Sequence, residues 1–314
     1  MLQDILTLEF IVALLTAAVR TGVPIALTTI GAIYAERSGI LSICLEGEML
    51  MGAFCGFIGM YYSNNLVIGM LCGILGGVLI SFVLAVSAIA LNANQTLTGI
   101  ALNMFATGAT SFGYWLACGV QTTPTFVVKL QNIPIPLLKD IPILGPVFFN
   151  HSVVVYLCYI LAAASYIIIF RTTFGLRLRA CGEYPRAAET MGVNVRRMRY
   201  ATTLISGVMS GLGGAFLTLV LVGMFADSMT ASRGFIALSI VIFGRWNPLA
   251  GFGAALFFGL MDALQLRLQA LGFSVPYQFL IMLPYVFTLL AMMFTGRNVK
   301  GPAFTGKPYI KEQL

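Results

Sequence analysis

Apolar runs of roughly 20 residues follow one another along almost the whole chain, with short polar stretches between them. A helix of about 20 apolar residues spans the hydrocarbon core of a bilayer, whereas an outer-membrane barrel shows segments of about ten residues with alternating polarity. The chain also has a mean hydropathy of +0.93 and only 9% charged residues. A soluble domain of this composition would expose large apolar patches. The sequence therefore predicts an all-α, polytopic integral membrane protein, a helical bundle of roughly 8–10 transmembrane helices.

Nine apolar runs predict the helices of a single transmembrane domain over residues 1–314. The run Gly234–Phe243 is too short to cross a bilayer alone. The first run contains Arg20 and Pro24, which could divide it into two half-helices and move the N-terminus from the outside to the inside. The predicted spans are Phe10–Tyr34, Ile40–Tyr61, Leu66–Leu91, Leu97–Cys118, Val153–Phe170, Tyr200–Val222, Gly234–Phe243, Leu249–Leu271 and Pro276–Phe294.

Basic residues indicate which loops face the cytoplasm. Eleven of the eighteen lysines and arginines lie in two segments, seven in residues 171–199 and four in residues 297–311. Loops rich in lysine and arginine are retained on the cytoplasmic side, so the 171–199 loop and the tail 297–314 are both expected there. The proline-rich loop 119–152 has only two lysines and no arginine, and it is expected outside. The predicted location is the bacterial plasma (inner) membrane, with several passes.

Several function classes are disfavoured by residue content. The net charge of +7 follows from the loop bias, whereas a nucleic-acid interface needs a basic soluble face with base-reading groups. The six cysteines include no C-x-x-C pair and His151 is the one histidine, so neither a metal site nor a disulfide framework is predicted. No H-E-x-x-H, G-x-S-x-G or phosphate-cradling G-x-x-x-x-G-K-[ST] pattern occurs. The chain is therefore predicted not to be an enzyme and to bind no cofactor itself.

Within the 171–199 loop, the spacing of Pro185 and Gly192 predicts a short helix. Proline suits the first turn of a helix, and glycine tolerates the left-handed conformation that closes one. A helix over Pro185–Met191 would present Ala187 and Ala188 as a small-residue surface that fits closely into a groove of a partner, with arginines around it. The alternative is a solvated basic loop that serves only membrane topology.

The run from Gly182 to Gly192, GEYPRAAETMG, resembles the coupling loop of ABC importer permeases, whose core reads Ala-Ala-x-x-x-Gly. The surrounding sequence, from GLRLRACGEYPRAAETMGVNVRRMRY through SGLGGAFLTL (residues 175–219), is similar to the permease family that serves branched-chain amino acids, ribose and nucleosides. Two further blocks, Glu36–Phe54 and Ser232–Gln269, make the match more specific. They most resemble the nucleoside permeases that work with a lipoprotein of the basic-membrane-protein type. Arg186 stands where many ABC importers carry glutamate, a departure that this family commonly shows.

This resemblance implies the permease subunit of an ABC importer, which forms the translocation pathway for nucleosides. The implied partners are ABC ATPase subunits that bind ATP and Mg²⁺, a second permease subunit in a heterodimer, an extracytoplasmic substrate-binding lipoprotein and membrane lipid, with no nucleic acid. Branched-chain amino acids or ribose-type sugars are the alternative substrates, and an ion-coupled secondary transporter is the alternative mechanism. The residues expected to couple transport to the ATPase are Gly182, Glu183, Pro185, Arg186, Ala187, Ala188 and Gly192.

Polar residues inside the apolar runs are candidates for the translocation pathway, because an ionisable group at mid-membrane costs about 2.5–3.5 kcal/mol and usually faces a cavity or a partner. For Glu46 and Glu48, the alternative is a solvated helix end near the cytoplasmic surface. Arg20 could instead pair with one of these acids, and the polar face of the eighth run could hydrogen-bond neighbouring helices. Glycine-interrupted segments at Gly39–Gly56 and Gly234–Gly253 occupy comparable places in the two halves, which hints at discontinuous helices around a central site. The pathway candidates are Asn103, Gln265, Glu46, Glu48 and Asp262.

Overall fold

The computed structural model describes residues 8–119, 125–134, 144–270 and 301–309, together with residues 278, 279, 282, 286, 289 and 293. Most of the predicted span Pro276–Phe294 therefore lies outside the described residues, as do parts of the 119–152 loop and of the tail 297–314. Helices make up nearly all of the described chain. Two short strands, β1 (Ile133–Pro134) and β2 (Asn150–His151), pair antiparallel beside them.

The helices follow the predicted apolar runs closely. They are α2 (Leu8–Arg37), α3 (Leu45–Ser63), α4 (Leu66–Ala85) with the π-helical turn η1 (Val86–Ala90), α5 (Gln95–Cys118), α6 (Leu144–Phe148), α7 (Val153–Arg171), α8 (Thr173–Glu183), α9 (Pro185–Thr190), α10 (Val195–Phe216) with the π-helical turn η2 (Leu217–Val222), α11 (Arg233–Phe243) and α12 (Pro248–Ala270). Within the described ranges, five helical stretches are long and apolar enough to cross a membrane: α2, α4 with η1, α7, α10 with η2, and α12. This confirms a polytopic helical membrane protein.

Polar residues at the helix ends explain where several helices begin. The side chain of Asn94 accepts hydrogen bonds from the amides of Thr96 and Leu97 at the start of α5, and Asn194 accepts one from the amide of Arg197 at the start of α10. These side chains satisfy amides that have no partner within the helix. Asn194 also explains why α10 begins at Val195, five residues before the predicted start at Tyr200.

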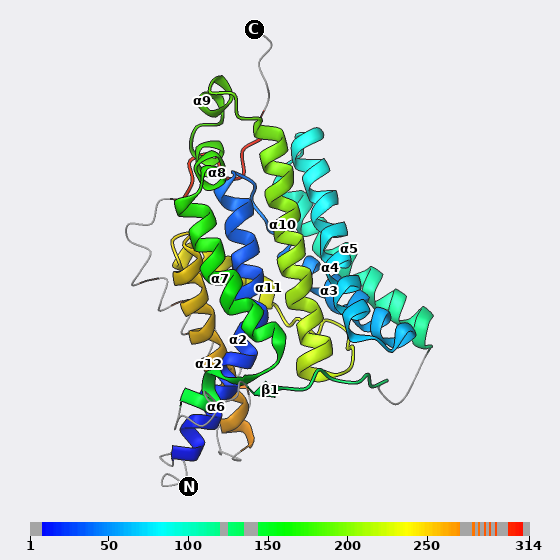
Figure 1. Cartoon of the computed structure of the whole chain (residues 1–314). Coiled ribbons are helices and arrows are strands. Elements are labelled where there is room, and N and C mark those ends of the chain that lie inside the picture. Colours follow the sequence, from blue (N-terminus) through cyan, green and yellow to red (C-terminus); the bar gives the residue numbers. More distant parts are fainter. Residues whose placement is uncertain are drawn as a thin grey trace.

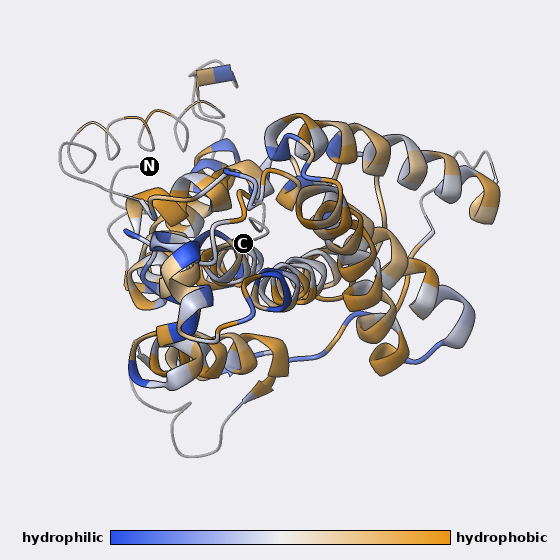
Figure 2. Cartoon of the chain, turned by 90° about the horizontal axis from the view of Figure 1, so that it is seen from above, coloured by the Kyte–Doolittle hydropathy of each residue, from blue (hydrophilic) through white to orange (hydrophobic). Residues whose placement is uncertain are grey.

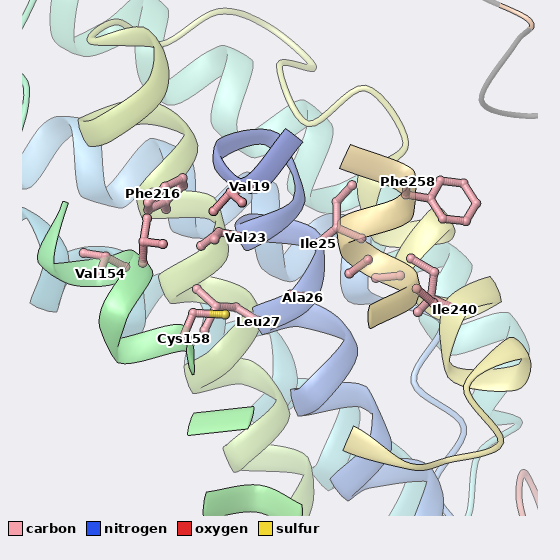
Figure 3. Close-up of a cluster of buried hydrophobic side chains, with 14 of the residues drawn as sticks. Val19, Val23, Ile25, Ala26, Leu27, Val154, Cys158, Phe216, Ile240 and Phe258 are labelled. Carbon is pink, nitrogen blue, oxygen red and sulfur yellow. The ribbon is translucent and has the colours of Figure 1, made fainter. Parts of the chain in front are cut away.

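Helix α2 runs without interruption through Arg20 and Pro24, so the predicted alternative of two half-helices is wrong. Proline removes one backbone donor from a helix, but α2 is enclosed by α10 and α12, which hold it straight. Close backbone contact is possible because Gly213 of α10 lies against the carbonyl of Pro24 and Gly22 lies against α12. Figure 3 shows the resulting core, in which Val23 and Leu27 of α2 lie among side chains of the neighbouring helices.

Glycines also allow α3, α4 and α10 to pack with their backbones nearly in contact. A Cβ atom built on Gly211 of α10 would lie 2.6 Å from the carbonyl oxygen of Gly73 and 3.1 Å from the Cα atom of Gly77, both in α4. A Cβ atom on Gly52 of α3 would lie 2.6 Å from the Cα atom of Gly211. Small residues at such crossings are the usual basis of helix association in membranes, where lipid supplies no hydrophobic drive between helices.

The two ends of the bundle differ in what covers them (Figure 1). Helices α8 and α9 and residues 301–309 lie at one end, which we call the α9 end. Helix α6 and the strands lie at the other, which we call the α6 end. The sides of the bundle are largely apolar (Figure 2), and large aliphatic side chains such as Leu71, Leu75 and Leu79 of α4 are exposed there. Membrane lipid is the environment that suits such a surface.

Candidate functional site

The predicted short helix exists as α9, which covers Pro185–Thr190 and ends one residue earlier than predicted. Gly192 has a φ of +84° and takes the left-handed conformation expected of it. The remainder of the 171–199 segment is not the loop that was predicted. Helix α8 occupies Thr173–Glu183, capped by the side chain of Thr172, and the last arginines of the segment already belong to α10.

The two alanines of α9 face opposite ways. Ala187 is exposed, whereas Ala188 is only 4% exposed and packs into a cluster with Cys181, Val195 and Tyr309. Successive residues of a helix point about 100° apart, so one alanine can face outward while the next faces the core. The expectation that both alanines are exposed on the outer surface is therefore wrong for Ala188, which is buried although it contributes to the lining of the groove between α8 and α9. Its role in coupling stays a prediction, now through packing beneath α9.

An apolar groove of about 400 Å³ lies between α8 and α9. Tyr184 and Met191, which are 70% and 84% exposed, stand beside it together with Leu176 at 61%. Ala180, Ala187 and Val193 contribute to its walls, and Arg177 and Glu183 contribute charged groups. Large exposed apolar side chains around a groove, outside the apolar sides of the bundle, mark a surface that another protein can cover.

Gly182 and Glu183 hold the C-terminal segment, by which we mean residues 301–309. The carbonyl of Gly182 accepts a hydrogen bond from the amide of Phe304 at 2.9 Å, and the Glu183 carboxylate accepts one from the amide of Ala303 at 3.3 Å. A side chain at position 182 would collide with the carbonyl oxygen of Arg37, so only glycine fits between the C-terminal segment and the end of α2. The described part of the predicted tail is thus packed against α8.

Arg199 joins the C-terminal segment to two membrane helices. Its side chain is 1% exposed, and its guanidinium donates to the carbonyls of Ser38 and Lys307, each at 3.2 Å. The guanidinium carbon also lies 5.9 Å from the ring centre of Tyr309, whose hydroxyl donates a hydrogen bond to the carboxylate of Glu189 in α9. Sequence reasoning missed this connection, because residues 301–309 carry no periodic pattern that indicates packing.

The hydroxyl of Tyr309 remains a donor over the whole physiological pH range. Burial, with the hydrogen bond to Glu189, raises the pKa of Tyr309 to about 12 from an ordinary value of 10.0. A tyrosine whose pKa is raised on folding contributes stability that is complete below its unfolded pKa and is lost as the pH rises through the folded value. The link between Tyr309 and α9 should therefore not change between pH 6 and pH 9.

Loss of the Tyr309 side chain is expected to free α9. Tyr309→Ala removes both the hydroxyl and the ring that packs against Ala188 and Arg199, and we expect tryptic cleavage at Arg186 in membranes to become at least about tenfold faster. Tyr309→Phe keeps the ring and loses only one hydrogen bond. We expect its rate of tryptic cleavage at Arg186 to rise only about fivefold. Equal cleavage rates in the wild type and in Tyr309→Ala would show that the C-terminal segment does not hold α9.

Two of the polar residues predicted inside the membrane, Glu46 and Glu48, lie at the start of α3. The Glu46 carboxylate accepts hydrogen bonds from the hydroxyl of Thr230 and from the amides of Ser232 and Gly234. Glu48 is completely buried and accepts from the thiol of Cys44 at 3.1 Å. Both lie in the first turn of α3, which agrees with the helix end of the alternative interpretation, but the expectation of an easily solvated carboxylate is wrong for Glu48.

Asn103 lies beside this turn, and both ends of its amide are engaged. Its oxygen accepts from the amide of Gly47 at 2.8 Å, and its nitrogen donates to the carbonyl of Ile43 at 3.0 Å. The bond to Ile43, together with the hydrogen bond that the side chain of Gln95 accepts from the amide of Leu41, holds this backbone outside a helix, and α3 begins at Leu45 and not at the predicted Ile40. Whether Asn103 also contacts substrate stays a prediction.

The other candidates lie on α12 and α2. Asp262 forms an ion pair with Arg233 at the start of α11, with an N–O distance of 3.0 Å, and Gln265 is partly exposed one turn further along α12. Arg20 lines a different cavity, with Arg267 and Pro146, so the predicted pairing of Arg20 with Glu46 or Glu48 is wrong. In the parts of the chain that the structure describes, no group of three or more His, Cys, Asp or Glu side chains could hold a metal ion.

The chain is similar to a known protein family and to proteins of known class. The family model described as branched-chain amino acid transport system / permease component matches residues 14–296. The guanosine ABC transporter permease protein NupQ of Bacillus subtilis is 40% identical over 301 residues, which cover 92% of this chain and 93% of that protein. No solved structure matches the chain.

Two further relatives have similar coverage. The nucleoside ABC transporter permease protein NupC of Lactococcus lactis is 37% identical over 92% of this chain and 94% of its own length. The putative glucose ABC transporter permease protein TsgC13 of Haloferax volcanii is 33% identical over 85% of this chain and 81% of its own length.

Proposed function

The chain belongs to the family of branched-chain amino acid transport system permease components, and from that premise we propose that it is the membrane subunit of an ABC importer for nucleosides. The observation that carries the substrate class is its high identity, over nearly the full length, to two permeases whose names specify guanosine or nucleosides. A sugar is the second candidate, supported by the more distant relative from Haloferax volcanii. As a permease component the chain is a transport subunit, not an enzyme.

We propose that the α9 end faces the cytoplasm and that the groove between α8 and α9 binds an ABC ATPase subunit. The seven arginines of residues 171–199 support this orientation, since basic loops are retained on the cytoplasmic side. The exposed side chains of Tyr184 and Met191 beside the groove support protein docking, because aromatic and methionine side chains are enriched in interfaces.

A displacement of α9 can be transmitted to the membrane helices through two direct contacts. Gly182 touches the end of α2 at Arg37, and Arg199 connects α10 with Ser38 and with the C-terminal segment. When the ATPase subunits close on ATP, a displacement of α8 and α9 would therefore act on α2 and α10 together. These two helices pack against each other and against α12 and α3, so they can rearrange the bundle as a unit.

The proposed assembly contains further subunits. ABC ATPase subunits would bind ATP and Mg²⁺, a second permease subunit would complete the pathway as a heterodimer, and an extracytoplasmic lipoprotein would deliver the substrate. The family supports the general composition, since ATP-driven transport needs a nucleotide-binding partner and this sequence has no phosphate-binding loop pattern. The heterodimer and the lipoprotein rest on the resemblance of the blocks Glu36–Phe54 and Ser232–Gln269.

Uptake of labelled substrates tests the proposal. Cells that express this gene with its partner genes should accumulate guanosine and adenosine well above cells without them, but should not accumulate leucine or ribose. A partner ATPase that cannot hydrolyse ATP should abolish this uptake. Accumulation of leucine or ribose instead would replace the substrate, and uptake that is insensitive to the ATPase would overturn the mechanism.

A further inference from the structure

Two helices begin inside the bundle, and their first residues meet. Gly234, in the first turn of α11, lies so close to the backbone of Leu45 and Glu46 that a Cβ atom would collide with it. From this junction α3 runs toward the α6 end, where Met60 packs beside Val127. Helix α11 runs the opposite way, and Trp246 just beyond it donates a hydrogen bond to Glu36 at 2.6 Å, at the α9 end.

The lengths of two helices give the distance of this junction from the α9 end. Helix α5 begins at Gln95, which binds the amide of Leu41 at the α9 end, and Asn103 contacts the first turn of α3 eight residues later. Eight residues of helix correspond to about 12 Å. Helix α11 has 11 residues and covers about 16 Å from the junction to the α9 end. Both distances are close to half of the hydrocarbon core, which is about 30 Å thick.

Glu46 holds the segment that leads into α11. One carboxylate oxygen accepts from the hydroxyl of Thr230 at 2.5 Å and the amide of Ser232 at 3.0 Å, and the other accepts from the amide of Gly234 at 2.7 Å. Ser232 makes no capping hydrogen bond with its own side chain, so Glu46 of α3 caps α11 in its place.

The backbone that Glu46 holds is strained. Ser228, Ala231 and Ser232 have φ angles of +54°, +47° and +64°, which residues with a side chain rarely adopt. Such conformations persist only where their surroundings impose them, and they are concentrated at functional sites. The hydrogen bonds that Thr230, Ser232 and Gly234 donate to Glu46 impose the conformation of Ala231 and Ser232.

Four residues of the same segment are exposed, although the segment is not helical and lies at the depth of the junction. Ala231 and Ser232 are exposed at the junction itself, and Asp227 and Ser228 are exposed just before it. Lipid cannot satisfy free backbone groups, so non-helical backbone at this depth must be buried in protein or line a water-filled cavity. The neighbouring ion pair of Arg233 and Asp262, with side chains 21% and 24% exposed, also requires polar surroundings.

We propose that the exposed residues of the 227–232 segment, which are Asp227, Ser228, Ala231 and Ser232, line the aqueous translocation pathway at mid-membrane and that Glu46 is the positioning residue of this segment. The proposal rests on the proposed transport function. It assigns to Glu46 a role other than direct substrate contact, because its carboxylate is already occupied by three donors of this segment. The strained segment is the element that can change conformation when α3 and α11 move apart.

Cysteine labelling tests the position of the segment without relying on transport. Ser232→Cys is compared with Leu75→Cys, an exposed apolar position on the side of α4, after the partly exposed Cys55 and Cys72 have been replaced by serine. A charged, membrane-impermeant maleimide should label Ser232→Cys at least about tenfold faster than Leu75→Cys, because a thiol reacts as the thiolate and needs water to ionise. Guanosine should slow the labelling.

Two labelling outcomes would overturn the inference. Ser232→Cys that is as unreactive as Leu75→Cys, with and without ATP, would show that protein or lipid covers the segment. Labelling that is fast but unchanged by every tested nucleoside, in an assembly that does transport them, would place the segment off the pathway. Fast labelling in an assembly that transports no nucleoside would retain the water-filled pathway and overturn only the proposed substrate.

Glu46 is tested by charge removal. Glu46→Gln puts an amide donor against the backbone donors of the segment, and we expect the transport rate per inserted molecule to fall at least about tenfold. The labelling rate of Ser232→Cys should change in the same variant, which a general loss of stability would not produce in the fraction that is folded and inserted. Glu46→Asp should restore part of the transport rate and bring the labelling rate back toward that of the protein with Glu46. Unchanged transport and labelling in Glu46→Gln would refute the positioning role.

Discussion

Replacing Ala188 by tryptophan is expected to abolish substrate uptake while the chain still inserts into the membrane. Ala188 is 4% exposed and packs against Cys181, Val195 and Tyr309, so an indole ring has no space unless α9 moves away from the bundle. Overpacking of this kind costs about 1–3 kcal/mol or more. Helix α9 has only six residues and lies at the end of the bundle, so it should be displaced while the membrane helices stay in place.

The measurement is the initial rate of guanosine uptake, divided by the amount of inserted protein. Ala188→Ser is the matched control, because it adds a single atom and should transport nearly as the wild type does. Ala187→Trp separates docking from packing, since Ala187 is exposed beside the groove and its replacement should weaken ATPase binding without making α9 sensitive to protease. Normal uptake by Ala188→Trp would remove α9 from the coupling mechanism.

Replacing Gly211 by leucine is expected to prevent accumulation of folded protein. The first side-chain atom would lie 2.6 Å from the carbonyl oxygen of Gly73, and α4 cannot yield because Gly77 faces the same position. Helices α3, α4 and α10 would have to separate. The free energy lost with their close packing would approach the whole free energy of unfolding of a domain, which is about 5–15 kcal/mol.

Immunoblotting of membranes measures this effect, and we expect at least a tenfold fall in the amount of protein, since about 1.4 kcal/mol already changes a folding equilibrium tenfold. Gly253→Leu is the matched control, because a Cβ atom at Gly253 of α12 has nothing within 4 Å and leucine favours a helix more than glycine does. If both variants accumulate equally, the close contacts of Gly211 do not determine the fold.

The membrane helices could be predicted because each is a continuous apolar run of the necessary length, and α9 could be predicted because Pro185 and Gly192 mark its ends. Helix α8 was missed because its sequence, TFGLRLRACGE, is too polar and too short to stand out from a basic loop. The late start of α3 could not be predicted either. Residues 40–44 are as apolar as a helix, but the side chains of Gln95 and Asn103, far away in the sequence, bind the backbone of Leu41 and Ile43 outside a helix.

The roles of the polar residues were the least predictable part. Glu46 and Asn103 were chosen as pathway candidates because they interrupt apolar runs, and the structure shows that their polar atoms hold backbone groups. The three partners of Glu46 lie 184, 186 and 188 residues away, and no local pattern of the sequence indicates such contacts. The exposed segment 227–232 was not predicted as pathway lining, although its serines and Asp227 stand between two apolar runs.

Reconstitution of the assembly tests the central claim most directly. The complex, purified through a tag on this chain and placed in liposomes with its substrate-binding protein, should accumulate labelled guanosine when ATP is supplied on the side of α9, and not with a non-hydrolysable analogue. The same preparation carrying Ala188→Trp should accumulate none. Accumulation that is equal without ATP and follows an imposed ion gradient would contradict the account, because coupling through α9 would then have no part in transport.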